Sequence, residues 1–450
     1  MIATLALSAL LLLPTPPPSA ADALPRDGER VLFIGDSITQ AGHYVVYVEA
    51  YLLTRFPDRT ITVINHGLSS ETAAGTSEPD HPFPRPWIHD RFERDVTAWH
   101  PDRVVACYGM NDGIYHPFSP DRFARYQAGI NRLIERARLE AGARIDLMTP
   151  PPYDPYRRQV GDPNAKHYGY RFPAVDYDDV LSRFGDWLRS LADDRLLVAD
   201  PHGEISEHLR LRREDRVSVS LSPDGVHPDP AGHWLIAQAL LTAWGAPAEV
   251  AEARVIVDPD SGTVRAEEGT LDDLSLRDGS LEMTWTSPLP LPLDPSWDPE
   301  FIRVAQIADR LNRYRLTVSG LPPGTYTLLA SETVDPTPKP VATCSAEELS
   351  AGLDLTSLPD FPTVAASRDV LRLLASLRSA QAQAWRASIR GEAPADSPPP
   401  PGDDDHLMAP IRALCQPLEV RIRISPVGDS SPSAPASPKD RASPRPHSLP

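Results

Sequence analysis

The chain has few cysteines, fewer basic than acidic residues and no long apolar segment in its body. Each of these shortages excludes some classes of protein. Three cysteines among 450 residues allow at most one disulfide, so disulfides do not hold the fold together. The formal net charge of −18 argues against nucleic acid or an anionic membrane surface as a partner. Beyond the first residues, no segment is apolar enough to cross a membrane.

The cysteines differ in their surroundings. Cys107 lies in an apolar run, which predicts a core position. Cys344 and Cys415 lie far apart in the sequence and can pair in an oxidising compartment, although nothing in the sequence requires it.

The N-terminus has the pattern of a secretory signal peptide over residues 1–23. Leu5 to Leu13 is apolar apart from Ser8, and small residues follow through Ser19 to Ala23 in an A-x-A-like cleavage site. This pattern predicts a secreted or periplasmic protein. The first four residues carry no Lys or Arg, and the alternative interpretation is a frayed N-terminus.

The length predicts two or three domains, and the 51 prolines gather near the termini and in loops. The patterns divide the chain into an α/β domain over 24–246, a β-rich module over 247–345, a helical segment with one further strand over 346–425, and a disordered Ser/Pro-rich tail over 426–450. The Pro- and Asp-rich stretch 393–405 is also predicted to be disordered. In the β-rich module, Tyr314–Ser319 and Thr325–Leu329 flank Leu321-Pro322-Pro323-Gly324 and predict a hairpin.

Strands and helices alternate through the first domain. The predicted strands cover 31–34, 60–65, 103–108, 144–149 and 196–199, and the predicted helices cover 44–56, 87–99, 121–140, 180–191, 204–214 and 230–244. This alternation predicts a parallel sheet with helices on both faces. The aperiodic stretch from Tyr153 to Tyr177 interrupts it and is long enough to be a lid or a binding loop.

Four signals stand at the carboxyl ends of the predicted strands or in the loops beyond them: Ser37, Gly67, Asn111 and the pair Asp224/His227. Because the carboxyl ends of parallel strands meet at one edge of the sheet, these residues are expected to share one site. Each has an ordinary structural explanation alone: a serine helix cap, a turn glycine, an Asx-turn asparagine and a loop pair. Their joint placement favours a catalytic group.

The residue types suit acyl transfer. Ser37 supplies a nucleophile, His227 a base, and Asp224 a carboxylate that orients the base. The Ser37 and Gly67 backbone N–H groups and the Asn111 side-chain amide supply donors for an oxyanion. Asp36 and Asp112 are interpreted as structural. Three nearby histidines lack metal-ligand spacing and predict no metal site: His43, His66 and His116.

Four blocks of the sequence resemble those of the SGNH hydrolases of the GDSL esterase/lipase superfamily. They are Gly35-Asp36-Ser37-Ile38, Asn65-His66-Gly67, Gly109-Met110-Asn111-Asp112 and Asp224-Gly225-Val226-His227-Pro228. Ile38 stands where the family usually has leucine, and Ser70 stands where it often has a further glycine. The resemblance covers about Arg30 to Trp244.

The resemblance implies a three-layer α/β/α, flavodoxin-like fold and hydrolysis of small acyl esters without metal or cofactor. An acetyl ester on a carbohydrate is the expected substrate, with specificity supplied by the Tyr153–Tyr177 loop. The alternatives are a lipase, a thioesterase or an O-acyltransferase with the same triad, or a non-catalytic binding protein of the cell envelope. A lipase is expected to have a larger apolar lid than this polar, aromatic loop.

Overall fold

The computed structural model describes residues 23–79, 81–157, 168–294, 296–333, 337–392 and 397–427. The predicted signal peptide, apart from Ala23, lies outside these residues. So do the tail beyond residue 427 and the middle of the Tyr153–Tyr177 loop.

A five-stranded parallel sheet forms the first domain, in the order β2-β1-β3-β4-β5. Its strands are β1 (Arg30–Gly35), β2 (Thr62–Asn65), β3 (Arg103–Cys107), β4 (Arg144–Met148) and β5 (Leu197–Ala199). Both faces of the sheet are covered, which explains why β3 is buried along its whole length. The predicted parallel α/β fold is confirmed.

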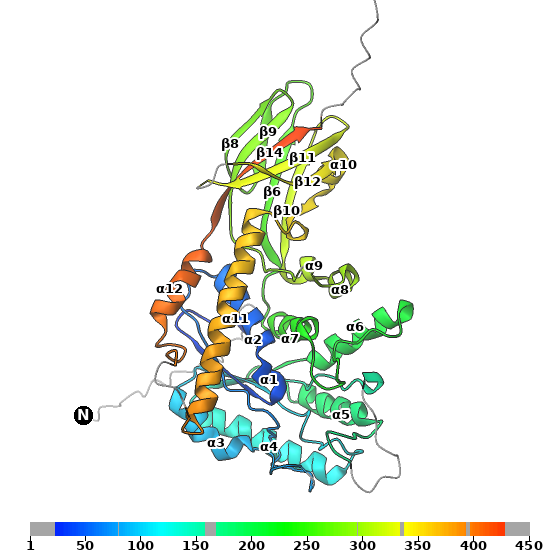
Figure 1. Cartoon of the computed structure of the whole chain (residues 1–450), viewed down its shortest axis with the longest axis vertical. Helices are drawn as coiled ribbons and strands as arrows, with labels where there is room; N and C mark the ends of the chain where they lie inside the picture. Colours follow the sequence, from blue (N-terminus) through cyan, green and yellow to red (C-terminus); the bar gives the residue numbers. More distant parts are fainter. Residues whose placement is uncertain are drawn as a thin grey trace, which may run out of the picture.

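Helices cover the two faces of this sheet (Figure 1). Helices α2 (His43–Arg55) and α7 (Pro230–Ala243) pack together on one face, with α6 (Pro201–Asp215) beside α7. Helices α3 (Ile88–Asp95), α4 (Pro120–Leu139) and α5 (Tyr177–Ser190) lie on the other face. Two short 3-10 helices, η2 (Thr97–Trp99) and η3 (Pro155–Arg157), lie in loops of this domain.

The C-terminal part contains a β-sandwich. One sheet has the order β13-β10-β6-β7 and the other the order β12-β11-β14-β9-β8. The strands are β6 (Glu249–Val257), β7 (Val264–Glu268), β8 (Thr270–Arg277), β9 (Ser280–Ser287), β10 (Arg313–Ser319), β11 (Thr325–Glu332), β12 (Lys339–Ser345), β13 (Leu353–Asp354) and β14 (Leu418–Pro426). Side chains of both sheets form one buried core, in which the Trp285 and Tyr314 rings stack 5.0 Å apart.

The sandwich differs from the sequence prediction in two respects. Strand β14 lies between β11 and β9, so the module extends beyond the predicted boundary at residue 345. The predicted hairpin is wrong, because β10 pairs with β6 and β13 while β11 pairs with β12 and β14. The turn at Leu321–Gly324 therefore carries the chain from one sheet to the other.

Residues 289–311 connect the two parts rather than completing the sandwich. They include α8 (Pro299–Ala305) and α9 (Ile307–Leu311), whose buried side chains belong to the core of the α/β domain. Arg55, at the end of α2, donates to the carbonyl oxygens of Leu289 and Leu311, at 2.9 Å each. The sandwich thus lies beyond the C-terminal end of α2, whereas the loop after β1 lies at its start.

Helix α11 (Pro362–Ser388) runs from the sandwich along the α/β domain (Figure 1). At its start Thr363 donates a hydrogen bond to the Tyr314 hydroxyl at 3.1 Å, and near its end the Trp385 ring stacks on His66 at 4.2 Å. The remaining helices are α10 (Ala346–Ala351), the 3-10 helix η4 (Leu355–Ser357) and α12 (Asp405–Leu414).

An ion-pair group holds α11 to the α/β domain. Arg378 binds Glu49 of α2 at 2.6 Å and Asp404 at 2.7 Å, and Gln381 also donates to Asp404 at 2.8 Å. Asp404 is 2% exposed. The prediction of disorder over 393–405 is therefore wrong for its described part, because a buried carboxylate with these partners fixes the backbone around it.

All three cysteines are free and buried. Cys344 belongs to the sandwich core and Cys415 to the core of the α/β domain, so the considered pair does not form. Cys107 ends β3 in the core, as predicted.

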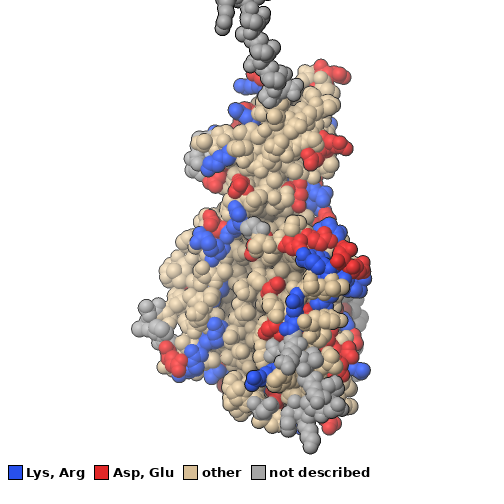
Figure 2. All heavy atoms as spheres, turned by 45° about the vertical axis from the view of Figure 1, so that its right-hand side comes forward, with Lys and Arg blue, Asp and Glu red and all other residues tan. Residues whose placement is uncertain are grey.

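Charges of both signs are interspersed on the face that Figure 2 shows. Along α6, for example, Arg210 pairs with Glu207 and Glu214, each at 2.7 Å. This face therefore presents no patch of one sign that would suit a polyanion. In the described part of the chain, no helix is long and apolar enough to span a membrane.

Candidate active site

Ser37 lies at the sharp turn where β1 ends and the short helix α1 (Ser37–Ala41) begins. Asp36 caps α1 by accepting a hydrogen bond from the Ile38 N–H at 2.9 Å. Gly35 must lack a side chain, because a Cβ there would collide with the Thr39 hydroxyl and lie 2.6 Å from the Cys107 carbonyl oxygen. These constraints fix the position of Ser37 at the carboxyl edge of the sheet.

Ser37, His227 and Asp224 form a continuous hydrogen-bonded series. The Ser37 Oγ lies 2.8 Å from His227 Nε2, and His227 Nδ1 lies 2.7 Å from Asp224 Oδ2. Ser37 and His227 are 190 positions apart in the chain. The structure thus brings together three residues that the sequence placed at the same sheet edge.

The loop between Asp224 and His227 holds the carboxylate in place. Asp224 Oδ1 accepts from the backbone N–H groups of Val226 at 3.0 Å and His227 at 2.7 Å. Gly225 has φ 83°, a conformation that favours glycine. Partial burial opposes the charge on Asp224, but the hydrogen bond with the His227 ring and those two N–H groups together hold its pKa well below the usual range. Asp224 therefore stays ionised and keeps Nδ1 of His227 protonated.

Asn111 lies in the loop after β3, the strand next to β1. Its side-chain oxygen accepts hydrogen bonds from Arg85 Nη1 and from the Tyr115 hydroxyl, both at 3.0 Å, and its amide nitrogen donates to the Glu71 carbonyl oxygen at 3.2 Å. An amide nitrogen carries two hydrogens, so one remains for another acceptor. The surrounding contacts hold the amide in the orientation in which its nitrogen is the donor.

Arg85 is a residue of this site that sequence reasoning missed. It is 7% exposed, and it binds Glu78 with two hydrogen bonds of 2.5 and 2.7 Å. Arg85 lies in an aperiodic loop between two prolines, and no motif marks it. Its burial, which could have drawn attention to it, is visible only in the structure.

The backbone N–H of Gly67 donates to Asn65 Oδ1 at 2.9 Å, and the Asn65 amide donates to the Thr39 carbonyl oxygen at 2.8 Å. A Cβ on Gly67 would collide with the backbone of Gln40. The close approach to α1 therefore explains the glycine. The Gly67 N–H can therefore bind an oxyanion only if it is shared between the oxyanion and Asn65 Oδ1.

The two acidic residues next to the site have the structural roles predicted for them. Asp36 caps α1, and Asp112 accepts from the backbone N–H groups of Ala73 and Ala74, at 2.8 Å each. Burial raises the pKa of Asp36 to about 6 and that of Asp112 to about 7.

The described end of the Tyr153–Tyr177 loop reaches the site. The Tyr170 hydroxyl donates to Asp224 Oδ2 at 3.1 Å, and its ring lies 5.5 Å from that of Tyr115 and 6.1 Å from that of His227. Two tyrosines thus connect the Asn111 amide with the Asp224 carboxylate. Sequence reasoning identified the loop but not this residue.

None of the described residues forms a group of three or more metal-ligating side chains that could hold an ion. His43 and His66 belong to aromatic contacts: His43 lies against His233 at 5.1 Å, and His66 stacks on Trp385. His116 contacts the ring of Tyr168 at 5.5 Å.

Residues 33–235 match the model of the GDSL-like Lipase/Acylhydrolase family. The chain thus contains a GDSL-like lipase/acylhydrolase domain over somewhat less than half of its length. The GDSL-like domain is 28% identical over 246 residues to an acetylxylan esterase of Geobacillus stearothermophilus, a match that covers 48% of this chain and 94% of that protein. The resemblance to SGNH hydrolases is confirmed, and the protein is a carboxylic ester hydrolase.

One solved structure extends the likeness in fold beyond this domain. A gut microbial diltiazem-metabolizing enzyme has a TM-score of 0.70 at 19% identity, covering 90% of this chain and 99% of that one. Its fold therefore matches the sandwich as well as the GDSL-like domain. A mutant of an acetyl-xylooligosaccharide esterase from Geobacillus has a TM-score of 0.37 at 26% identity, covering 50% of this chain and 97% of that one.

Proposed function

We propose that the protein hydrolyses small acyl esters, acetyl esters on carbohydrate above all, through an acyl-enzyme on Ser37. The observation that carries this proposal is the series Ser37–His227–Asp224, with hydrogen bonds of 2.8 and 2.7 Å. This is the arrangement of nucleophile, base and orienting carboxylate that acyl transfer requires.

In the acylation step His227 Nε2 takes the proton of Ser37 as Oγ attacks the ester carbonyl carbon. The Asp224 carboxylate stabilises the imidazolium that forms, and the imidazolium then protonates the departing alcohol. Deacylation repeats the sequence with water as the nucleophile, which releases the carboxylic acid and restores Ser37.

The negative charge on the tetrahedral intermediate needs fixed donors. Ser37 is the first residue of α1, where backbone N–H groups have no partner within the helix, and Asn111 offers its second amide hydrogen. The Gly67 N–H, which also donates to Asn65 Oδ1 at 2.9 Å, is the third donor. Arg85 draws electron density from the Asn111 oxygen and so strengthens its amide as a donor.

Three observations favour a carbohydrate ester over a lipid. An acetylxylan esterase is similar to the chain in sequence. The Asp224 and His227 side chains are 38% exposed, so the described residues leave the site open to solvent. The half-exposed ring of Tyr170 borders it, and such a ring offers an apolar face together with a polar edge.

We also propose that the protein is exported, on the apolar run and small residues of its first 23 positions. N-terminal sequencing of protein recovered from the culture medium or periplasm tests this. A new N-terminus near Ala23 supports export, and an intact Met1 on cytoplasmic protein contradicts it.

The substrate is tested with acetylated xylan and acetylated pectin fragments beside long-chain acyl esters, acyl thioesters and an acyl acceptor. Each is offered to the wild type, to Ser37→Ala and to Ser190→Ala, an exposed serine at the end of α5 that serves as the matched control. Acetate release by wild type and Ser190→Ala but not by Ser37→Ala supports the proposal. Faster turnover of long-chain esters or thioesters, transfer to the acceptor, or binding without turnover would each favour the corresponding alternative.

A further inference from the structure

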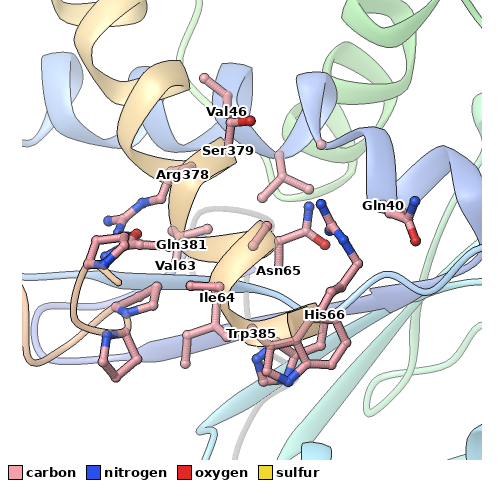
Figure 3. A pocket seen from close by; sticks show the side chains of 18 of the residues that line it. Gln40, Val46, Val63, Ile64, Asn65, His66, Arg378, Ser379, Gln381 and Trp385 are labelled. Carbon is pink, nitrogen blue, oxygen red and sulfur yellow. Dashed lines mark hydrogen bonds between the residues drawn. The ribbon is translucent and has the colours of Figure 1, made fainter. Parts of the chain in front are cut away.

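A cavity of about 400 Å³ lies between α11 on one side and α2 with β2 on the other. Figure 3 shows its labelled side chains: Val46 of α2 and Val63 and Ile64 of β2 on one wall, and Gln381 and Trp385 of α11 on the other. Its volume falls within the range of small-molecule sites. None of Ser37, Asn111 and His227 lines it, so it is separate from the catalytic group.

The cavity is apolar over most of its surface and aromatic at one end. There the ring of Trp385 lies parallel to that of His66, with 4.2 Å between centroids and 8° between planes, and Trp99 meets His66 edge-on at 4.5 Å. Burial lowers the pKa of His66 to about 4, so the His66 ring is uncharged at neutral pH. The surroundings suit a flat hydrocarbon group.

Two arginines of α11 line the cavity, and their partners differ. The charge of Arg378 is balanced by Glu49 and Asp404, at 2.6 and 2.7 Å. Arg386, two turns further along the same face of the helix, has neither an ion pair nor a hydrogen bond to any described residue, although it is partly buried. A partly buried guanidinium that has no counter-ion among the described residues, beside an apolar cavity, favours an anion, and its planar set of donors matches a carboxylate.

We propose that this cavity binds a small, flat, apolar monocarboxylate, with its hydrocarbon part between α11 and β2 and its carboxylate on Arg386. The site adjoins the catalytic region through Asn65, which lines the cavity and also accepts the hydrogen bond of the Gly67 N–H. Asn65 therefore belongs both to the wall of this cavity and to the hydrogen bonds around Gly67 at the active site.

Calorimetric titration of the full-length chain with cinnamate tests the proposal, with cinnamyl alcohol as the uncharged match. Cinnamate is expected to bind, and the alcohol to bind about tenfold or more weakly because it lacks the charge-assisted hydrogen bonds. Arg386→Gln should weaken cinnamate binding to the level of the alcohol, and Arg386→Lys should recover part of the loss.

Two further variants locate the binding. Ala382→Trp fills the cavity and should abolish binding, and Arg372→Gln, which changes an exposed arginine on the same helix outside the cavity, should leave binding unchanged. Circular dichroism and thermal melting establish that each variant is folded. Equal cinnamate affinity in wild type and Arg386→Gln, or no binding to the wild type at millimolar cinnamate, would overturn the proposal. Binding lost in Ser37→Ala but kept in Arg386→Gln would assign cinnamate to the catalytic site and overturn it as well.

Discussion

The Arg85 guanidinium donates to the side-chain oxygen of Asn111 at 3.0 Å while Glu78 neutralises it. A buried cation thus acts on the far side of the amide whose nitrogen serves as a donor in the proposed mechanism. This contact has two effects. It prevents the Asn111 amide from flipping, and it polarises the amide N–H that faces the substrate. Arg85 is in this account a positioning residue, because it works through Asn111.

Removal of Arg85 should lower kcat far more than it changes KM. Arg85→Met alone would leave the Glu78 carboxylate buried without a partner, so the informative variant is the double change Arg85→Met with Glu78→Met. Loss of orientation at Asn111 should reduce kcat between about tenfold and 10²-fold. Steady-state kinetics with p-nitrophenyl acetate measure this. Glu78→Gln, which keeps Arg85 on Asn111, is the control and should lose less; an unchanged kcat in a folded double variant would refute the positioning role.

Asn111→Ala should lower kcat by about 10²–10³, the usual effect of deleting one oxyanion donor. It should also lower the free energy of unfolding by about 1–3 kcal/mol, because Arg85 and the buried Tyr115 hydroxyl each lose an acceptor. Enzyme kinetics and urea denaturation measure the two effects separately. A variant that is destabilised but fully active would remove Asn111 from the oxyanion site.

Arg378→Met should destabilise the protein by about 3–5 kcal/mol, because Glu49 and Asp404 would remain buried as unpaired charges. The loss should also release α11 from the α/β domain and open the chain after Ser388 to proteases. Denaturant unfolding and limited proteolysis report on these changes. Arg372→Gln breaks an exposed pair on the same helix and should change stability by less than about 1 kcal/mol. Similar behaviour of the two variants would show that the ion-pair group does not hold α11.

Thermal stability should fall as the pH is lowered from about 6.5 to 5. Burial lowers the pKa of five described histidines: that of His43, those of His66, His89 and His208 to about 4, and that of His233 to about 3. Below their unfolded pKa of 6.5 the unfolded chain binds protons that the fold does not, which stabilises the unfolded state.

Two carboxyls oppose this trend. The folded pKa values of Asp36 and Asp112 are raised to about 6 and 7, so the fold takes up protons there before the unfolded chain does and gains stability as the pH falls through those values toward the unfolded pKa of about 4. The balance places the maximum of Tm near neutral pH. His208, whose ring nitrogens have no hydrogen-bond partner among the described residues, offers the test: His208→Leu should flatten the acid side of the Tm–pH curve. An unaltered slope would contradict this explanation.

The sequence predicted the parts of the structure that depend on local signals. Short apolar strands specify the sheet, and Ser37, Asn111 and His227 lie in the motifs that the sequence places at its edge. Ser37 and His227 are 190 positions apart, but their proximity could be predicted because the carboxyl ends of parallel strands share one edge of the sheet.

Contacts between distant segments without a motif could not be predicted. Strand β14 alternates in polarity, but nothing in its residues specifies β9 and β11 as its partners. Asp404 lies in a Pro- and Asp-rich stretch whose composition suggests disorder. It is buried and ordered because Arg378, which is distant from it in the sequence, forms an ion pair with it. Arg85 and Tyr170 likewise have roles at the site only because the fold places them against Asn111 and Asp224, respectively.

The central claim, an acyl-enzyme on Ser37, is tested most directly by mass spectrometry of enzyme quenched during turnover of p-nitrophenyl acetate. Digestion should yield an acetylated peptide that contains Ser37, together with a burst of p-nitrophenol equal to the enzyme concentration if deacylation is the slower step. Ser37→Ala should show neither the acetylated peptide nor the burst. Acetylation at another residue, or full turnover by Ser37→Ala, would contradict the account.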